Sequence, residues 1–302
     1  EFSDIQNNQW LSLFDVDRSC ILDPIDHPLP FTPFKDFTGR TINEINLYSS
    51  EMASALCSID RVSASANMTN RLSEAIVEAY KETNGAPITF TKMLEEYQSK
   101  MADPSKDDTI SSVLKQLVRA NIFEEEDKAD LIGDCYIIKM DGYPKDGPIA
   151  KAIVYFLISK LNNIYEQLEK QATNDEVVQI RHFSIIDEAH YMLDFDNRPL
   201  RNLIAVGRNK GLSIILATQN MSSFKSKGFD FYANAQYPLI MKQQTIDDKV
   251  IKDLYGVSGS ELQDVRTAIA GLQKGELIIK DQMAFALGMG NKYKKINVTH
   301  LI

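Results

Sequence analysis

Two short apolar runs in the second half of the chain each stop at polar side chains, and a helical pattern joins them. The first run, FSII, ends at Asp187 and Glu188, and the second, LSIILA, ends at Thr218 and Gln219. Short continuous runs of β-branched and aliphatic residues are typical of strands buried in a parallel sheet. The carboxyl ends of such strands lie along one edge, where open α/β sheets bind their ligands. The pattern therefore predicts that the two acids and Gln219 lie side by side.

A block of helical periodicity separates the earlier strand patterns. Residues 19–23 (SCILD) and 134–140 (DCYIIKM) have the character of short strands, each followed by a turn rich in Pro or Gly. From residue 41 to 131, apolar side chains recur three and four positions apart. This spacing predicts three or more helices with no strand between them, and Thr89 is suited to start one of them.

Strand and helix patterns alternate through the rest of the chain. A long amphipathic helix is predicted over residues 149–171, and two more over 249–256 and 258–272. Two late β patterns, GELIIK at 275–280 and MAFALGM at 283–289, are expected to form a hairpin. Alternation of this kind predicts an α/β fold with a mostly parallel sheet and helices on both faces.

The composition narrows the class of protein. The chain has 302 residues, 44% of them hydrophobic and 25% charged, which is ordinary for a globular protein. No apolar run reaches the roughly 20 residues of a membrane span and no signal peptide opens the chain, so we expect a cytoplasmic protein. Its first residue is Glu1 rather than Met, which indicates a processed or cloned fragment. The three cysteines are far apart and favour neither disulfides nor a zinc knuckle.

The net charge of −9 argues against a protein whose whole surface binds nucleic acid, although local basic loops remain compatible with it. The acidic run at residues 124–127 has the character of a solvated helix face. His182 and His190 flank the paired acids, but their spacing does not match the H-E-x-x-H pattern of zinc hydrolases. A metal-hydrolase site is therefore disfavoured.

The paired carboxylates suit nucleotide hydrolysis. Asp187 can hold Mg²⁺ through water, Glu188 can polarise the attacking water, and Gln219 can sense the γ-phosphate. The competing interpretation is structural, because two acids at a helix N-terminus are favoured by the helix dipole without any catalysis.

At this point the sequence resembles the HerA/FtsK group of hexameric DNA-pumping ATPases. The matching segments are IIDEAH at 185–190, VGRNKGLSIILATQ at 206–219 and GELIIK at 275–280. CILDPIDHPLPFTPF and YIIKMDGYPKDGPIAKAIVYFLISKL also look like segments of that group, so the likeness covers most of the chain outside the helical block. Within the group, the chain resembles the HerA-like ATPase of phosphorothioation-dependent (Dnd/Dpt) restriction systems.

The resemblance implies a RecA-like core over residues 1–40 and 132–302, with a helical insertion or subdomain over 41–131. It implies ATP and Mg²⁺ as cofactors, double-stranded DNA as a partner, a homo-oligomeric ring, and partner nuclease or restriction subunits. Asp187 resembles the magnesium-organising carboxylate, Glu188 the catalytic base and Gln219 the γ-phosphate sensor.

The resemblance also singles out basic residues. Arg208 matches the position from which the family often presents an arginine to a neighbouring subunit, and Arg201 is a weaker candidate for that role. The alternative for Arg208 is that it only favours a helix C-terminus capped by Gly211. Lys225 and Lys227 can form a loop that grips DNA phosphates, or a basic loop that is merely solvated.

One departure from the family is serious. A P-loop requires G-x-x-x-x-G-K-[ST], and neither Gly-Lys-Ser nor Gly-Lys-Thr occurs in the chain. In the family this loop lies just before the segment matching residues 19–23, so we expect the chain to begin after it and to bind ATP poorly by itself. The rival explanation is a naturally degenerate subunit.

Two other functions remain open. A non-catalytic RecA-like subunit would keep the fold and dock the other subunits of a DNA restriction complex. A fragment of a DEAH-box helicase would carry the same tetrad, but its next strand would end in Ser-Ala-Thr and a second RecA-like domain would follow. Here that strand ends in Ala-Thr-Gln-Asn, and 82 residues remain (302 minus 220), fewer than a typical domain of about 100 to 150 residues needs.

Overall fold

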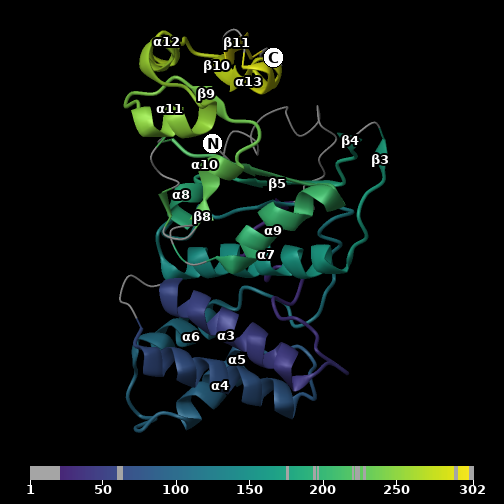
Figure 1. The fold of residues 1–302 in the computed structure, drawn as a ribbon. Helices are drawn as coiled ribbons and strands as arrows, with labels where there is room; N and C mark the ends of the chain where they lie inside the picture. Colours follow the sequence, from purple (N-terminus) through teal and green to yellow (C-terminus); the bar gives the residue numbers. More distant parts are fainter. Residues whose placement is uncertain are drawn as a thin grey trace. The chain divides into compact units, whose positions relative to one another are not determined.

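The computed structural model shows a mixed α/β chain (Figure 1). It describes residues 21–59, 64–174, 177–192, 195, 197–219, 221, 225–226, 229–288 and 292–298. Contacts divide the chain into two compact units. The first comprises the described residues of Glu1–Ser184 and Tyr191–Ile215, and the second those of Ile185–His190 and Leu216–Ile302.

A short parallel strand pair and a block of helices form the beginning of the first unit. Strand β1 (Ile21–Leu22) pairs in parallel with β2 (Ile137–Ile138). Lys139 joins their ends, because its Nζ donates to Asp23 Oδ2 over 2.7 Å, and this hydrogen bond lowers the pKa of the Asp23 carboxyl. The helices between the two strands are α3 (Ile42–Ile59), α4 (Ala66–Glu82), α5 (Phe90–Ser99) and α6 (Thr109–Ala120).

Side-chain caps start these helices where the sequence allows them. Thr89 caps α5 by accepting from the amide of Lys92, as predicted. Asp108 caps α6 and forms a reciprocal capping box with Ser111. Such caps satisfy amides that have no partner within the helix, and each is worth about 1 kcal/mol. The predicted block of helices is confirmed.

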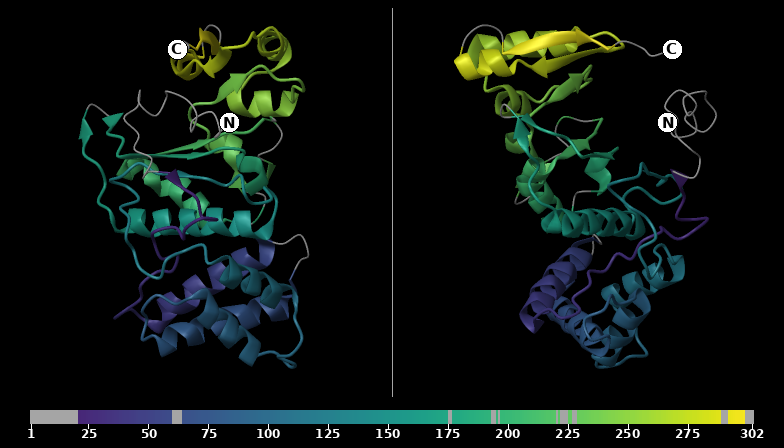
Figure 2. Two further views of the ribbon diagram at one scale, coloured as in Figure 1. Left: turned by 180° about the vertical axis from the view of Figure 1, so that it is seen from behind. Right: turned by 90° about the vertical axis from the view of Figure 1, so that its right-hand side faces the viewer.

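Helix α7 (Pro148–Gln167) contacts α3 and α6 of the helical block (Figure 2). It also contacts α9 (Arg198–Val206). Pro148 at its first turn needs no amide partner there. Phe156 of α7 is fully buried, with its ring 5.7 Å from Phe34, 5.1 Å from Phe90 and 5.8 Å from Phe123. This aromatic cluster joins α7 to the helical block.

The crossover predicted between the two site strands is present. Strand β5 (His182–Ile186) is followed by α8 (Ala189–Met192), α9, a 3₁₀ turn η2 (Gly207–Lys210) and β6 (Leu212–Leu216). β5 and β6 pair with each other. The amide of Arg181 donates to Gly211 and that of Ala217 to Ile186, so both strands run in the same direction. A short antiparallel pair, β3 (Thr173–Asn174) and β4 (Val177–Val178), precedes them.

Gly211 is the tightest point of this crossover. Its φ is +83°, and a Cβ there would lie 2.7 Å from the Gln179 carbonyl oxygen and 3.0 Å from the Arg181 amide. We expect Gly211→Ala to lower the free energy of unfolding of the 302-residue chain by at least about 2 kcal/mol. Gly39→Ala is the matched control, since Gly39 has a φ of +74° but open space around its Cβ, and it should cost only about 1 kcal/mol. Urea denaturation measures both, and equal losses would contradict the steric argument.

The second unit contains an antiparallel sheet of three strands in the order β11-β10-β9. These are β9 (Leu239–Met241), β10 (Glu276–Lys280) and β11 (Tyr293–Asn297). Ile240 and Ile278 face each other across β9 and β10 and join a core with residues of α11 (Asp248–Tyr255) and α12 (Gly259–Ala270). The remaining described elements are β7 (Lys225–Ser226), β8 (Phe229–Asp230), α10 (Phe231–Asn234) and α13 (Gln282–Leu287).

The hairpin predicted from GELIIK and MAFALGM is wrong. β10 pairs with β11 and β9, while residues 282–287 form helix α13. The physical reason is composition, because Met, Ala and Leu are strong helix formers and a short apolar run does not distinguish strand from helix.

The α/β class is confirmed: β1-β2 and β5-β6 are parallel pairs, and the other pairs among the described strands are antiparallel. The division at residues 40 and 131 stays a prediction. None of the helices in the described ranges is both long and apolar enough to cross a membrane.

Candidate functional site

The register of β5 and β6 brings the predicted polar residues to one place in the second unit. The amide of Ala217 donates to the Ile186 carbonyl over 2.9 Å, and the amide of Ala189 donates to the Ala217 carbonyl over 2.9 Å. These two bonds fix the backbone after β5 against the backbone after β6. Asp187 and Glu188 therefore lie beside Thr218 and Gln219, as the sequence predicts.

Glu188 is the most constrained residue of this edge. Its φ is +49°, a left-handed conformation that is costly for a residue with a side chain. Its Oε1 accepts a hydrogen bond from Nε2 of Gln219, and its Oε2 lies 3.4 Å from Nδ1 of His190. The side chain is only 14% exposed. Backbone strain of this kind costs about 1 to 3 kcal/mol and clusters at functional sites.

Asp187 is exposed, and its Oδ1 accepts from the Glu188 amide over 2.9 Å, which orients the carboxylate. Magnesium in nucleotide sites is held by one or two carboxylates, water and the substrate's phosphates rather than by a complete protein cage. A single exposed, oriented carboxylate at a strand end fits that requirement. No cluster of three or more His, Cys, Asp or Glu that could hold a metal by itself occurs in the described part of the chain.

The capping interpretation of the two acids is weak in this geometry. Helix α8, which follows them, is only four residues long, so its dipole is small. The Asp187 carboxylate is directed to the adjacent amide, and the Glu188 carboxylate to Gln219 and His190. The arrangement thus favours a polar site over a helix cap.

Arg208 and Lys210 lie in the first unit, on η2, and have different surroundings. Arg208 is exposed. Nζ of Lys210 donates to the carbonyls of Tyr165 and Glu166 over 2.6 and 3.0 Å, at the C-terminal end of α7. Lys210 thus has the structural role of a cation at a helix C-terminus. Gly211 ends η2 in the left-handed conformation, as expected for a glycine cap.

The remaining candidates are placed as follows. Arg201 is half-buried on α9. Lys225 lies on β7, which pairs with β8, and Lys227 lies outside the described residues. His182 belongs to the first unit, where its ring stacks on Tyr165 at 6.4 Å and burial lowers its pKa. A stacked, half-buried ring of this kind is a packing residue.

The sequence missed the contact between His190 and Thr218. Oγ1 of Thr218 lies 3.0 Å from Nδ1 of His190, the same nitrogen that faces Glu188. The available signal was positional, because His190 follows the acids by two residues and Thr218 precedes Gln219. Once the two strands are expected to end together, these side chains are expected to meet.

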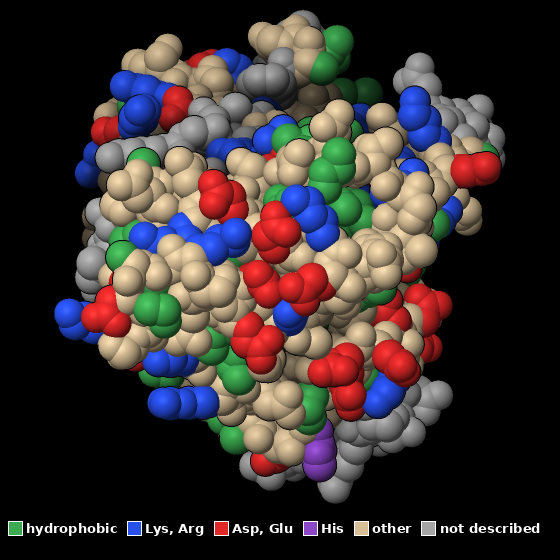
Figure 3. All heavy atoms as spheres, turned by 90° about the horizontal axis from the view of Figure 1, so that it is seen from below, with side chains coloured by type: hydrophobic (Ala, Val, Ile, Leu, Met, Phe, Trp, Pro, Cys, Tyr) green, Lys and Arg blue, Asp and Glu red, His purple; other side chains and the backbone are tan. Residues whose placement is uncertain are grey.

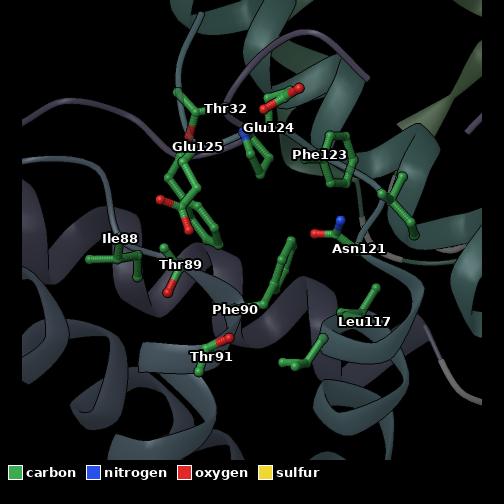
Figure 4. Close-up of a pocket in the computed structure, with 14 residues that line it drawn as sticks. Thr32, Ile88, Thr89, Phe90, Thr91, Leu117, Asn121, Phe123, Glu124 and Glu125 are labelled. Carbon is green, nitrogen blue, oxygen red and sulfur yellow. Dashed lines mark hydrogen bonds between the residues drawn. The ribbon is translucent and has the colours of Figure 1, made fainter. Parts of the chain in front are cut away.

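A hollow in the first unit has different chemistry (Figure 4). Figure 4 shows Phe90 and Phe123 among its lining side chains, together with the carboxylates of Glu124 and Glu125. Its volume is about 70 Å³, well below the roughly 300 to 1,000 Å³ of ligand-binding pockets. Its lining residues include two acids and no Lys, Arg or His, so it is both too small and of the wrong charge for a nucleotide.

The surface at the helical end of the first unit is also not basic. Figure 3 shows acidic side chains across the middle of the face seen from below, with Lys and Arg interspersed and more frequent toward one side. A face of this kind has no continuous positive strip for nucleic acid. It agrees with the net charge of −9.

Comparison with solved structures identifies the fold. The chain is similar to VirB4 of Thermoanaerobacter pseudethanolicus, with a TM-score of 0.65 and 16% identity over 98% of this chain and 79% of that one. It is also similar to the bacterial conjugative coupling protein TrwB, solved with sulphate and with the non-hydrolysable ATP analogue ADPNP. For both TrwB structures the TM-score is 0.53 and the identity 13%, over 92% of this chain and 73% of TrwB.

Neither a protein-family model nor a curated protein matches the chain. At the identities above, the likeness concerns the fold. The chain therefore has the fold of the VirB4 and TrwB structures, and the RecA-like α/β fold predicted from the sequence is confirmed.

Proposed function

We propose that the chain is the carboxylate-bearing part of an ATPase that couples ATP hydrolysis to the movement of double-stranded DNA. The observation that carries this proposal is the contact between Glu188 and Gln219 across the ends of β5 and β6. Two residues from distant parts of the sequence meet there in a strained, partly shielded site. The fold supports the proposal, because TrwB shares it and has been solved with an ATP analogue.

Each residue of the edge has a distinct task in this proposal. Glu188 accepts a proton from the attacking water, since an ionised carboxylate near a bound water is a competent general base. Gln219 donates to the γ-phosphate. Its hydrogen bond to Glu188 couples phosphate binding to the position of that carboxylate. Asp187 would hold Mg²⁺ through water, and the ion would supply charge neutralisation at the phosphates.

The phosphate-binding loop is supplied, in this proposal, by a segment of the protein that precedes Glu1. Two observations support this part of the proposal: the chain has a RecA-like fold, and neither Gly-Lys-Ser nor Gly-Lys-Thr occurs in these 302 residues. Backbone amides of such a loop surround the phosphates, and its lysine neutralises them. Without that loop the chain binds ATP poorly.

We place the activity in the cytoplasm, in a homo-oligomeric ring that handles DNA for a prokaryotic defence, restriction or repair system. Arg208 is an argument for the ring, because its guanidinium is exposed and suited to contact the phosphates of a nucleotide bound by a neighbouring subunit. Lys225 and Lys227 would contact the DNA backbone. ATP hydrolysis would activate a partner nuclease of a phosphorothioation-dependent system.

The proposal is tested in the protein extended by its natural upstream segment. Double-stranded DNA should stimulate ATP hydrolysis, and Gln219→Ala should lower the stimulated rate by about 10²-fold, the typical effect of losing one transition-state donor. Gln243→Ala is the matched control, because Gln243 is a partly exposed glutamine of the same unit whose side-chain amide donates to the Met241 carbonyl. It should leave the rate unchanged.

Steady-state phosphate release measures these rates. An extended wild type that hydrolyses no ATP would favour a non-catalytic subunit, and equal rates for both glutamine variants would remove Gln219 from the site. Strand separation by the same protein would favour the DEAH-box helicase.

A further inference from the structure

The carboxylate of Glu188 accepts a hydrogen bond at one oxygen and has the His190 ring beside the other. Gln219 donates to Oε1, while Oε2 is shielded from solvent and faces Nδ1 of His190 at 3.4 Å. A shielded carboxylate oxygen is unfavourable unless a donor or a positive partial charge faces it. The His190 ring is 18% exposed, so it too is fixed by its surroundings.

Thr218 fixes the ring of His190. Its Oγ1 lies 3.0 Å from Nδ1. The backbone sets this contact, because the hydrogen bond from Ala189 to Ala217 places the two following residues opposite each other. Thr218, His190 and Glu188 therefore form a chain of contacts that starts on the strand carrying Gln219 and ends at the carboxylate.

Two oxygens face Nδ1 of His190, and they favour one placement of the ring proton. A lone pair on Nδ1 would face the carboxylate oxygen with like partial charge, whereas an N–H on Nδ1 attracts both the carboxylate and the hydroxyl oxygen. An N–H on Nδ1 is therefore the arrangement that both neighbouring oxygens, Glu188 Oε2 and Thr218 Oγ1, favour.

We propose that His190 and Thr218 are positioning residues that hold the Glu188 carboxylate in its productive place. Glu188 needs such contacts because its φ is +49°, and a strained backbone relaxes to another conformation unless neighbouring groups hold it. The inference rests on the proposed function, since the position of Glu188 matters for hydrolysis only if it is the base.

The activity test compares Thr218→Val with Thr218→Ser in the protein extended by its upstream segment. Valine keeps the shape but loses the hydroxyl, so kcat should fall about 10-fold with KM unchanged, because misplacing a base affects the reaction and not nucleotide binding. Serine keeps the hydroxyl and should retain the wild-type rate. In a His190→Gln background, Thr218→Val should cause little further loss, since Thr218 acts through His190.

A second measurement does not depend on activity. Nitrogen-15 NMR of the histidine rings in the 302-residue chain should show a protonated Nδ1 for His190, assigned by the loss of its signal in His190→Gln. The signal should change in Thr218→Val and remain in Thr218→Ser.

Either of two results would overturn the inference. One is an unprotonated Nδ1 at His190, and the other is an equal effect of valine and serine at position 218. A wild-type protein that hydrolyses no ATP would count against the proposed function, whereas the NMR result would still decide whether His190 is held as described.

Discussion

Glu188→Gln should reduce ATP hydrolysis by about 10²- to 10⁴-fold in the protein extended by its upstream segment, the range expected for losing a general base. Glutamine has nearly the shape of glutamate, but its amide does not accept a proton from water. Nucleotide affinity should be kept, because Glu188 contacts Gln219 and His190 rather than forming the phosphate cradle. Phosphate release and equilibrium binding of a fluorescent ATP analogue separate the two effects.

Glu125→Gln is the matched control for this prediction. Glu125 is an exposed glutamate in the first unit, far along the chain from the β5 and β6 edge. Its substitution should change neither hydrolysis nor binding. If Glu188→Gln kept the wild-type rate of hydrolysis, the assignment of Glu188 as the base would be wrong.

Phe156→Ala should lower the free energy of unfolding of the 302-residue chain by about 3 to 5 kcal/mol. The ring is completely buried, and it joins α7 to Phe34, Phe90 and Phe123 of the preceding segments. Truncation leaves a cavity among groups that belong to different elements, so local collapse cannot fill it easily. Urea denaturation followed by circular dichroism measures the loss.

Phe183→Ala makes the same chemical change at an exposed ring. Phe183 is 54% exposed on β5, so its substitution should change the stability by less than about 0.5 kcal/mol. A loss below about 1 kcal/mol for Phe156→Ala, or equal losses for both variants, would mean that the aromatic cluster does not hold the helical block to α7.

The helices of the chain were predictable because their signals are local. Thr89 and Asp108 are residue types that cap helices, and they precede α5 and α6 in the sequence. The spacing of apolar residues in α3 to α7 identifies the buried faces of these helices. The same local argument failed at residues 282–287, where the spacing of a short apolar run fits both strand and helix and its composition of Met, Ala and Leu favours the helix. The pairing of β10 is not local either, because its partners are β9, earlier in the chain, and β11, further along it.

The location of the site was predictable from the sequence, but the individual contacts between its side chains were not. Strands that end in polar residues predict that Asp187, Glu188 and Gln219 share an edge, and the structure brings Glu188 and Gln219 together. The left-handed backbone of Glu188 and its approach to His190 depend on the relative register of β5 and β6, which no local pattern encodes. The position of Arg208 relative to a neighbouring subunit depends on an assembly, so its role stays a proposal.

The central claim is that Asp187, Glu188 and Gln219 converge on a bound triphosphate. The most direct measurement is a crystal structure of the upstream-extended protein with ADPNP and Mg²⁺. The γ-phosphate should lie within about 2.6 to 3.2 Å of the Gln219 amide, with Glu188 one water molecule away and Asp187 facing the ion. A nucleotide bound elsewhere, with these three side chains directed away from its phosphates, would contradict it.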